Sequence, residues 1–308
     1  MEDDMRSGFL KRYTANPIIT PEDMPFDCYA VYNAGATIFE DKVLLLLRAE
    51  NSEIHCNFYV ATSEDGINFD ISDKPIEYPY RAFEKMYGSH RYDARITEID
   101  DEYYICHAIH NKFGATFGIA KTTDFITFEP VGNTSLPFNR NAVLFPEKIN
   151  GLYARMERPV DDRGKGYIWV SYSPDLVFWG KSMPIDLPVM LWNENKSGAG
   201  AVPIKTEHGW LEIYHGTQNT ASTENYFLGV ALLDLEDPSK VVAAPRKFVL
   251  APEEPYECMG QVPNVVFTSG AVVMPDGTLN VYYGGADTRV CLAQTTVEEL
   301  LAFCLQAK

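Results

Sequence analysis

The sequence predicts an all-β protein: a five-bladed β-propeller followed by a short C-terminal helix. Three observations carry this prediction. A hairpin of two apolar runs around a short polar turn recurs five times, an Asp-x-x-x-aromatic turn recurs three times, and one helix-capping pattern stands near the end of the chain. Repeated strand-rich units suit a ring, because each sheet covers its neighbour and closure protects the edges. We expect one domain over residues 1–308.

The five hairpins follow one another along the chain and begin at Tyr32, Tyr92, Asn141, Gly198 and Asn264. Short turns rich in Asp, Asn and Gly between β-rich runs are typical of hairpins. The turns are Asp41-Lys42, Asp100-Asp101, Asn150-Gly151, His208-Gly209 and Asp276-Gly277. Five hairpins therefore predict five blades.

The Asp-x-x-x-aromatic turns begin at Asp65, Asp124 and Asp175, with spacings of 59 and 51 residues. This distance suits a unit of four short strands. Near the end of the chain, Thr296 followed three residues later by Glu299 forms a capping box before an apolar run, which predicts the terminal helix. Residues 81–90 fit a loop or a short helix equally well.

Charge and composition exclude several classes of protein. With 26 Lys+Arg against 43 Asp+Glu the net charge is −17, which disfavours nucleic acid and anionic membranes as partners. The longest aliphatic run, residues 43–47, is too short to span a bilayer, and no secretory h-region opens the chain. Six cysteines without a CxxC motif predict reduced thiols and a cytoplasmic protein.

In a propeller the innermost strands converge on the axis, so equivalent repeat positions predict one shared site. Asn33, Asp93 and Asn141 open the first strands of three units. Each polar residue alone also fits a solvent-exposed strand end. As a set they indicate a ring of hydrogen-bonding groups for a polyhydroxylated or anionic ligand. The residues at or just past the second strands are Arg48, Arg158, His215 and Asp287.

Segments in all five units resemble the β-mannoside phosphorylases of glycoside hydrolase family 130. The resemblance runs from Asn16 to the C-terminus, with its motifs in order, one set per blade. They are YNAGATIF and LLLLRAE, YDARIT, RNAVLFPEKINGLY and ERP, KSGAGAVPI and IYHG, and YYGGAD. The resemblance implies a five-bladed propeller that cleaves a β-mannoside with inorganic phosphate, inverting the configuration to give α-mannose 1-phosphate and a shortened sugar.

The resemblance also implies a role for each matching residue. Asp93 would be the general acid, with its proton passing through the 3-hydroxyl of the mannose. Among the phosphate-binding residues, Lys205 is an alternative to Lys196, and Tyr214 could share the role of His215. The mannosyl unit would be held by Asn33, Arg48 and Asp287, and phosphate by Arg140, Asn141, Arg158, Lys196 and His215.

The chemistry agrees with one acid and several cations. An inverting glycosidase needs an acid and a base that activates water. Phosphate is already an anionic nucleophile, so a phosphorylase needs a proton donor and a cationic cradle that offsets repulsion near the sugar. Arginine grips phosphate through paired hydrogen bonds. No metal and no cofactor is expected beyond inorganic phosphate as co-substrate.

Two other functions stay open: a β-mannoside hydrolase of the same family, and a non-catalytic sugar-binding propeller. Glu257 is the second candidate for a catalytic carboxylate. His107 and His110 do not indicate a metal site, because strand positions three apart face opposite sides. The linkage cut, 1,4 or 1,2, and the acceptor sugar depend on loops such as residues 77–90 and 217–225. A homo-oligomer is expected.

Overall fold

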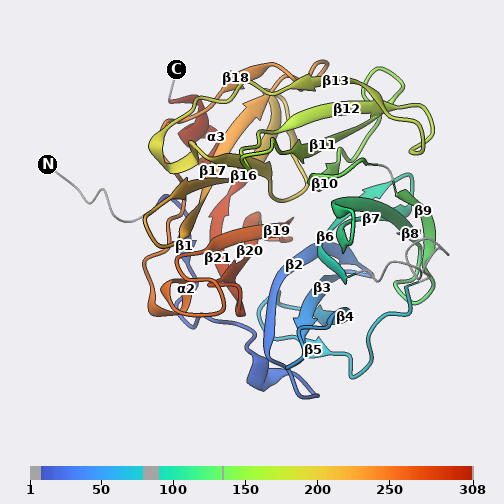
Figure 1. The fold of residues 1–308 in the computed structure, drawn as a ribbon, viewed down its shortest axis with the longest axis vertical. Helices are drawn as coiled ribbons and strands as arrows, with labels where there is room; N and C mark the ends of the chain where they lie inside the picture. The colour runs from blue at the N-terminus through green and yellow to red at the C-terminus, as the bar shows by residue number, and fades with distance from the viewer. Residues whose placement is uncertain (1–7, 79–89, 134, 307–308) are drawn as a thin grey trace, which may run out of the picture.

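The computed structural model describes residues 8–78, 90–133 and 135–306, and it confirms the five-bladed propeller. Five antiparallel sheets follow one another in chain order around a common axis (Figure 1). Blade 1 lies across the axis from the boundary between blades 3 and 4. Residues 81–89, whose conformation the sequence left open, lie outside the described residues.

Blades 1 to 3 are each built from consecutive strands, with the innermost strand first. Blade 1 comprises β2 (Ala30–Phe39), β3 (Lys42–Glu50), β4 (Cys56–Ser63) and β5 (Asp70–Ile71). Blade 2 comprises β6 (His90–Ile99), β7 (Glu102–Asn111), β8 (Gly114–Thr122) and β9 (Glu129–Asn133). Blade 3 comprises β10 (Asn139–Leu144), β11 (Tyr153–Pro159), β12 (Trp169–Ser173) and β13 (Gly180–Pro184).

The last two blades have extra features. In blade 4, β15 (Ile204–Thr206) pairs with β16 beside the four-strand path. That path is β14 (Lys196–Ala199), β16 (Gly209–Asn219), β17 (Glu224–Leu233) and β18 (Val241–Ala243). Blade 5 comprises β19 (Val266–Val273), β20 (Thr278–Gly285), β21 (Arg289–Thr296) and β1 (Lys11–Arg12). The short helices are η1 (Pro21–Asp23), η2 (Leu191–Asn193), α2 (Pro255–Cys258) and α3 (Val297–Leu305).

The N-terminal strand closes the ring. β1 pairs antiparallel with β21, so the outermost strand of the last blade comes from the start of the chain. Arg12 anchors this strand, since its guanidinium donates to both carboxylate oxygens of Glu257 at 2.8 and 2.9 Å. Tyr283 donates to the same carboxylate at 2.7 Å. Glu257 is fully buried in this network, which joins the two ends of the chain.

Apolar side chains fill the spaces between neighbouring blades. Leu45 and Leu47 of blade 1 pack with Val272 and Leu292 of blade 5 in one buried cluster. Val143 and Met156 of blade 3 share a second cluster with Trp210 of blade 4. Burial of each large apolar side chain stabilises the fold by about 1.5–3 kcal/mol. The ring is therefore held together by contacts that no single blade could make.

The three Asp-x-x-x-aromatic turns share one local structure. Oδ1 of Asp65 accepts the backbone N–H groups of Ile67 and Asn68, both at 2.8 Å. Asp124 and Asp175 accept the equivalent pairs. These hydrogen bonds lower the pKa of all three carboxyls. The repeat therefore encodes an Asx-type turn between the outer strands of a blade.

The terminal helix α3 begins where the capping pattern predicts. Thr296 accepts the backbone N–H of Glu299 at 3.1 Å, and Leu300 and Cys304 are buried between blades 4 and 5. The reciprocal contact differs from a full capping box, since the Glu299 carboxylate accepts from the hydroxyl of Thr295 at 3.0 Å.

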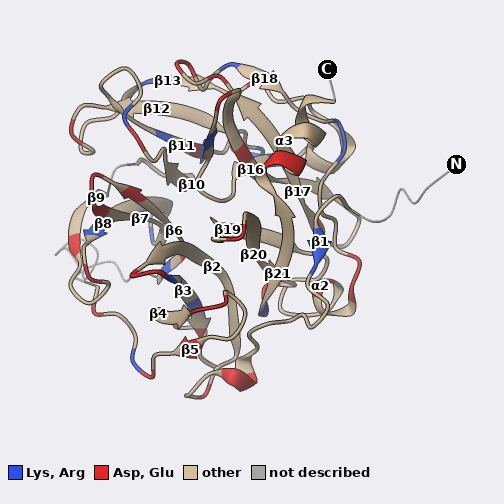
Figure 2. Cartoon of the chain, turned by 180° about the vertical axis from the view of Figure 1, so that it is seen from behind, with Lys and Arg blue, Asp and Glu red and all other residues tan. Residues whose placement is uncertain are grey.

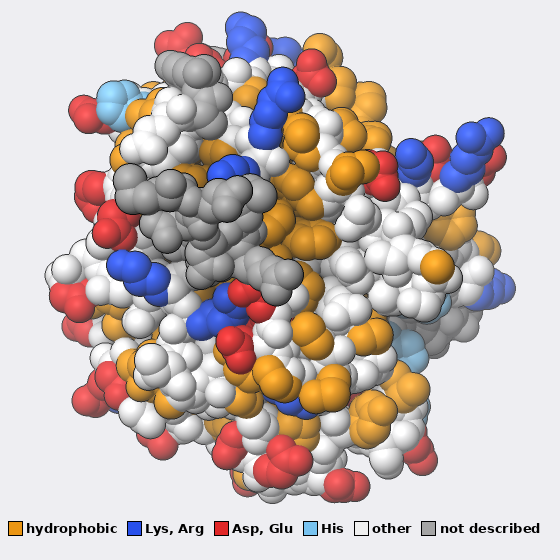
Figure 3. Space-filling view, turned by 90° about the vertical axis from the view of Figure 1, so that its left-hand side faces the viewer, with side chains coloured by type: hydrophobic (Ala, Val, Ile, Leu, Met, Phe, Trp, Pro, Cys, Tyr) orange, Lys and Arg blue, Asp and Glu red, His pale blue; other side chains and the backbone are white. Residues whose placement is uncertain are grey.

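Acidic and basic residues both occur in loops and on strands (Figure 2). The buried charged side chains among the described residues are also of both signs, for example Glu50 and Glu257, and Arg95 and Arg155. On the face shown in Figure 3, acidic side chains are spread widely and hydrophobic groups are interrupted by polar ones. No helix among the described residues has the length and apolar character needed to cross a bilayer.

Candidate active site

A cavity of about 510 Å³, here called the axial pocket, receives side chains from all five blades. It brings together seven of the nine predicted site residues. The other two, Lys196 and His215, lie behind its wall. The lining residues are Asn33, Arg48, Glu50, Glu53, Ile54, His55, Cys56, His90, Tyr92, Asp93, His110, Arg140, Asn141, Arg158, Tyr226, Val265, Phe267 and Asp287.

A repeated backbone irregularity explains why Asn and Asp open the inner strands. The pairing register shifts in β2, β6 and β10 at the position of Asn33, Asp93 and Asn141. These three residues have φ of 48°, 54° and 60°. Asn and Asp tolerate this left-handed conformation better than other side-chain-bearing residues. Each bulge turns one polar side chain out of the ladder and into the pocket.

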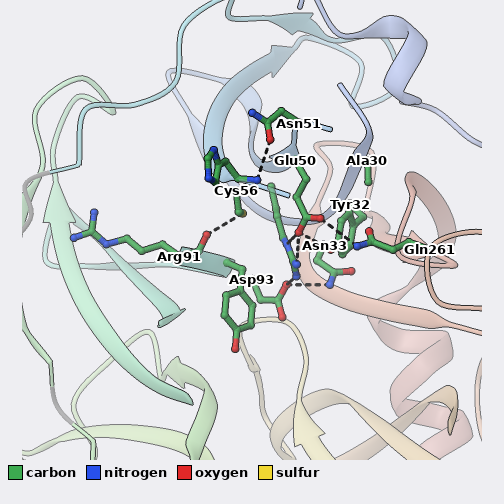
Figure 4. A network of polar contacts seen from close by, with 12 residues as sticks. Ala30, Tyr32, Asn33, Glu50, Asn51, Cys56, Arg91, Asp93 and Gln261 are labelled. Carbon is green, nitrogen blue, oxygen red and sulfur yellow. Dashed lines mark hydrogen bonds and ion pairs between the residues drawn. The ribbon is translucent and has the colours of Figure 1, made fainter. Parts of the chain in front are cut away.

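Asp93 lies at the centre of a hydrogen-bonded group between blades 1 and 2 (Figure 4). Its Oδ1 accepts from Arg48 Nη1 at 2.9 Å and from Asn33 Nδ2 at 3.0 Å. Oδ2 makes no hydrogen bond to a described residue. Asp93 is 9% exposed, and Oδ1 of Asn33 is buried without a partner among the described residues. Oδ2 of Asp93 is therefore available to a ligand, whereas Oδ1 of Asn33 is buried against Gly284.

Glu50 supports Arg48 from behind. Its Oε1 accepts from Arg48 Nε at 3.1 Å and also from Nη2, and from the Tyr32 hydroxyl at 2.8 Å. Gln261 donates to Oε2 at 3.3 Å. Glu50 is only 2% exposed, so this buried carboxylate holds the guanidinium in one orientation toward Asp93.

Asp287 reaches the pocket from the turn after β20, where its φ is 49°. Burial raises the pKa of its carboxyl to about 7, with Arg48 opposing and the negative charges of Asp93 and Glu50 adding to the rise. Arg48 thus faces three carboxyl groups. Near neutral pH, Asp287 is able to donate or accept a proton.

The opposite side of the pocket is cationic. Arg140 and Arg158 both line it, and neither makes an ion pair with a described residue. Arg140 donates to the Tyr92 hydroxyl at 3.2 Å. Burial and the charge of Arg140 lower the pKa of Arg158 to about 10, and its Nε is buried without a partner among the described residues. Two adjacent guanidinium groups without a carboxylate form a site suited to an anion.

His215 is fully buried just behind this cationic side. Its Nε2 accepts from Arg158 Nη1 at 3.0 Å and from Asn141 Nδ2 at 3.4 Å. Burial and the nearby cations hold the pKa of His215 well below its usual value. The ring is therefore neutral with its proton on Nδ1, and it orients Arg158 and Asn141 rather than lining the pocket.

Comparison with known proteins identifies the family. The profile of glycoside hydrolase family 130, described as beta-1,4-mannooligosaccharide phosphorylase, matches residues 9–306. The chain belongs to this family. A beta-1,4-mannooligosaccharide phosphorylase of Ruminococcus albus is 36% identical over 308 residues, covering 95% of this chain and 90% of that protein.

Two further relatives act on a different linkage by name. A beta-1,2-mannobiose phosphorylase of a Thermoanaerobacter species is 37% identical, covering 94% of this chain and 98% of that protein. The structure of the beta-1,2-mannobiose phosphorylase from Listeria innocua, in complex with beta-1,2-mannobiose, superposes with a TM-score of 0.86 at 29% identity. It covers 96% of this chain and 99% of that chain. The family resemblance of the sequence is thus confirmed.

Several residues of this family-130 site were missed from the sequence. Glu50 carried a signal, because strand positions two apart share a face and Arg48 was already a candidate. Tyr92 also carried a signal, since it directly precedes the candidate Asp93 in the sequence. Glu224 and Tyr226 offered no such signal, since they lie on β17, the third strand of the blade 4 path. The pocket-lining histidines are His55, His90 and His110.

The alternatives left open by the sequence lie elsewhere in this family-130 fold. Lys205 pairs with Glu147 on the surface at 2.6 Å, outside the pocket. Tyr214 is buried against Trp192 in the core. Glu257 belongs to the buried network of Arg12. Of the two strand histidines, His107 is buried against Tyr78, at 3.0 Å from its hydroxyl, and His110 lines the pocket.

Proposed function

We propose that the protein is an inverting β-mannoside phosphorylase, which converts a β-mannoside and inorganic phosphate into α-mannose 1-phosphate and a shortened sugar. The observation that carries this proposal is the pair Arg140 and Arg158. They lie in the pocket across from the group around Asp93, and neither pairs with a carboxylate of the described residues. An anionic nucleophile explains cations on that side better than water does.

Asp93 is the proposed general acid. Its Oδ1 is held by Asn33 and Arg48, which leaves Oδ2 to carry the proton toward the substrate. A general acid carries its proton when the sugar is bound. A relay through the 3-hydroxyl of the mannose suits this geometry, because the hydroxyl would pass its own proton to the leaving oxygen and regain one from Asp93.

The mannosyl unit is proposed to bind between blades 1, 2 and 5. Asn33 offers its side-chain amide, Arg48 its guanidinium and Asp287 its carboxyl to the hydroxyl groups of one sugar. Glu50 fixes Arg48 and is a positioning residue. Phosphate is proposed to bind Arg140, Arg158 and Asn141, with Lys196 and His215 supporting them. Inorganic phosphate is the co-substrate in this proposal, without a further cofactor.

The acceptor sugar is proposed to leave through the side of the pocket formed by blade 1 and the edge of blade 2. Inversion requires the nucleophile and the leaving group on opposite faces of the sugar. Phosphate would sit at blades 3 and 4, and blade 1 lies across the axis from them (Figure 1). The residues there are Glu53, Ile54, His55, His90 and His110.

One observation favours the hydrolase alternative. Asp287, with a pKa of about 7, is a carboxyl able to accept a proton from water. In a hydrolase it would act as the base, and the arginines would have only a structural role. A cytoplasmic location and a homo-oligomeric assembly stay predictions.

The proposal is tested in the synthetic direction. The protein is incubated with α-mannose 1-phosphate and, separately, mannose, glucose or N-acetylglucosamine. We expect release of inorganic phosphate and formation of a β-mannoside with at least one acceptor, and the product reports the linkage. Failure to release phosphate with any sugar, including short β-mannosides as acceptors, would count against phosphorylase activity.

A further inference from the structure

Glu224 accepts hydrogen bonds from four side chains behind the cationic side of the pocket. Oε2 accepts from the ammonium of Lys196 at 2.8 Å and from the Tyr226 hydroxyl at 3.3 Å. Oε1 accepts from Thr217 at 2.6 Å and from the amide of Asn195. The side chains of Lys196 and Glu224 are 15% and 22% exposed, so this ion pair is largely withdrawn from water.

The sheet of blade 4 fixes this carboxylate independently of the lysine. Lys196 pairs with Thr217 across β14 and β16, and Thr217 pairs with Tyr226 across β16 and β17. Glu224 opens β17 two residues before Tyr226, on the same face of the strand. Asn195, Thr217 and Tyr226 therefore hold a fixed negative charge, and the ammonium of Lys196 donates to it.

The other groups around Lys196 oppose its charge. Burial disfavours the ammonium most, and Arg158 of β11 and Arg140 of β10 repel it, so the pKa of Lys196 is lowered even with its partner present. His215 of β16 is neutral, and burial raises the pKa of Tyr226, which stays a phenol. Burial alone would raise the pKa of Glu224, but hydrogen bonds from Lys196 and Thr217 lower it. Glu224 is thus the anion that stabilises Lys196.

We propose that Glu224 is a positioning residue that keeps Lys196 charged and anchored beside the phosphate end of the pocket. This inference rests on the proposed phosphorylase function. Arg140 and Arg158 keep their charge without help, because a guanidinium holds its proton far above neutral pH. A buried ammonium beside two arginines loses its proton more readily, so it needs an anionic partner to stay charged.

The inference predicts a specific pH signature. In Glu224→Gln, Lys196 loses its counter-ion and releases its proton at a lower pH than in the wild type. At pH 6 the lysine remains charged, and the KM for phosphate stays within about threefold of the wild type. At pH 9 a smaller share of Lys196 is charged in the variant than in the wild type, and the KM for phosphate rises about tenfold relative to the wild type, the effect of one charge lost beside the bound anion. The KM for the mannoside changes little.

The test compares the KM for phosphate at pH 6 and pH 9, with phosphate binding by calorimetry as a second readout. The matched control is Glu147→Gln, which breaks the exposed ion pair to Lys205 and should leave both values unchanged. In the decisive rescue, Lys196→Arg is added to Glu224→Gln. Arginine stays charged without a partner, so the pH 9 defect should shrink.

The outcomes separate the two proposals. Equal pH dependence in the wild type and Glu224→Gln, or a pH 9 defect that the Lys196→Arg addition leaves unchanged, would overturn the role of Glu224. If Glu224→Gln fails to fold, Glu224→Asp keeps the charge with a shorter reach, and its KM for phosphate relative to the wild type should be about the same at both pH values. A defect confined to pH 9 in that variant would contradict the inference. A wild type that neither binds nor consumes phosphate would overturn the proposed function instead.

Discussion

Arg48 Nη1 lies 2.9 Å from Oδ1 of Asp93, and the same guanidinium is held from behind by the buried carboxylate of Glu50. One cation therefore joins the proposed acid to a carboxylate that lies almost out of contact with solvent. By binding Oδ1, Arg48 fixes which oxygen of Asp93 faces the pocket. The proton-donating role of Asp93 depends on this arrangement.

Asp93→Asn tests the acid. The substitution keeps the shape of the side chain and removes its proton, so turnover should fall by about 10²–10⁴. Sugar binding and the unfolding temperature should change little. The measurement is phosphorolysis rate together with mannoside binding by calorimetry. Activity within about tenfold of the wild type would reassign the acid, and Asp287 would be tested next.

Arg48→Met tests the buried ion pair. It leaves Glu50 without its cation, and breaking a buried pair from one side costs about 3–5 kcal/mol of unfolding free energy. The double variant Arg48→Met with Glu50→Gln should recover part of that loss, because no unpaired charge remains. Denaturant unfolding of the four proteins measures the coupling. Additive losses from the two substitutions would show that the pair is not coupled.

Asp287 should make the protein less stable as the pH rises. Its folded-state pKa of about 7 lies above the ordinary value of an Asp carboxyl. At pH values between these two pKa values, the folded protein therefore binds more protons than the unfolded chain. The unfolding free energy contributed by this group therefore falls from about pH 4 to pH 7. Asp287→Asn should remove that part of the pH dependence in denaturant titrations at pH 5 and pH 8. Unchanged pH dependence in the variant would contradict the elevated pKa.

The histidines at the rim test the direction of the leaving group. His55→Ala and His110→Ala should raise the KM for the acceptor sugar several-fold in the synthetic direction. The KM for α-mannose 1-phosphate should stay near the wild type, because that product occupies the other side of the pocket. An equal rise in the KM for the acceptor sugar and the KM for α-mannose 1-phosphate would show that these histidines do not form a separate acceptor site.

Local patterns in the sequence predicted much of the fold and the site. The hairpin turns and the Asx-type turns are set by neighbouring residues, and they revealed the five blades. Asn33, Asp93 and Asn141 shared a repeat position because all three occupy the same strand bulge. Because the innermost strands of a propeller converge on its axis, the predicted ring was enough to bring these three residues together.

Other features depend on contacts between distant segments. The pairing of β1 with β21 joins the two ends of the chain, and neither strand carries a local signal for it. Lys196 matched a phosphate-binding motif, yet the distant Glu224 holds its ammonium behind the pocket wall. His215 matched in the same way, but burial behind Arg158 makes it a neutral acceptor. The positions of both side chains follow from electrostatics that a linear motif does not contain.

The phosphate dependence of bond cleavage tests the central claim most directly. β-1,4-Mannobiose and β-1,2-mannobiose are each incubated with the protein, with and without inorganic phosphate, and mannose 1-phosphate and the free mannose released are measured separately. We expect at least one substrate to yield α-mannose 1-phosphate and one equivalent of mannose with phosphate, and to remain uncut without it. Steady release of two equivalents of free mannose in phosphate-free buffer would mean that water is the nucleophile and would contradict the account.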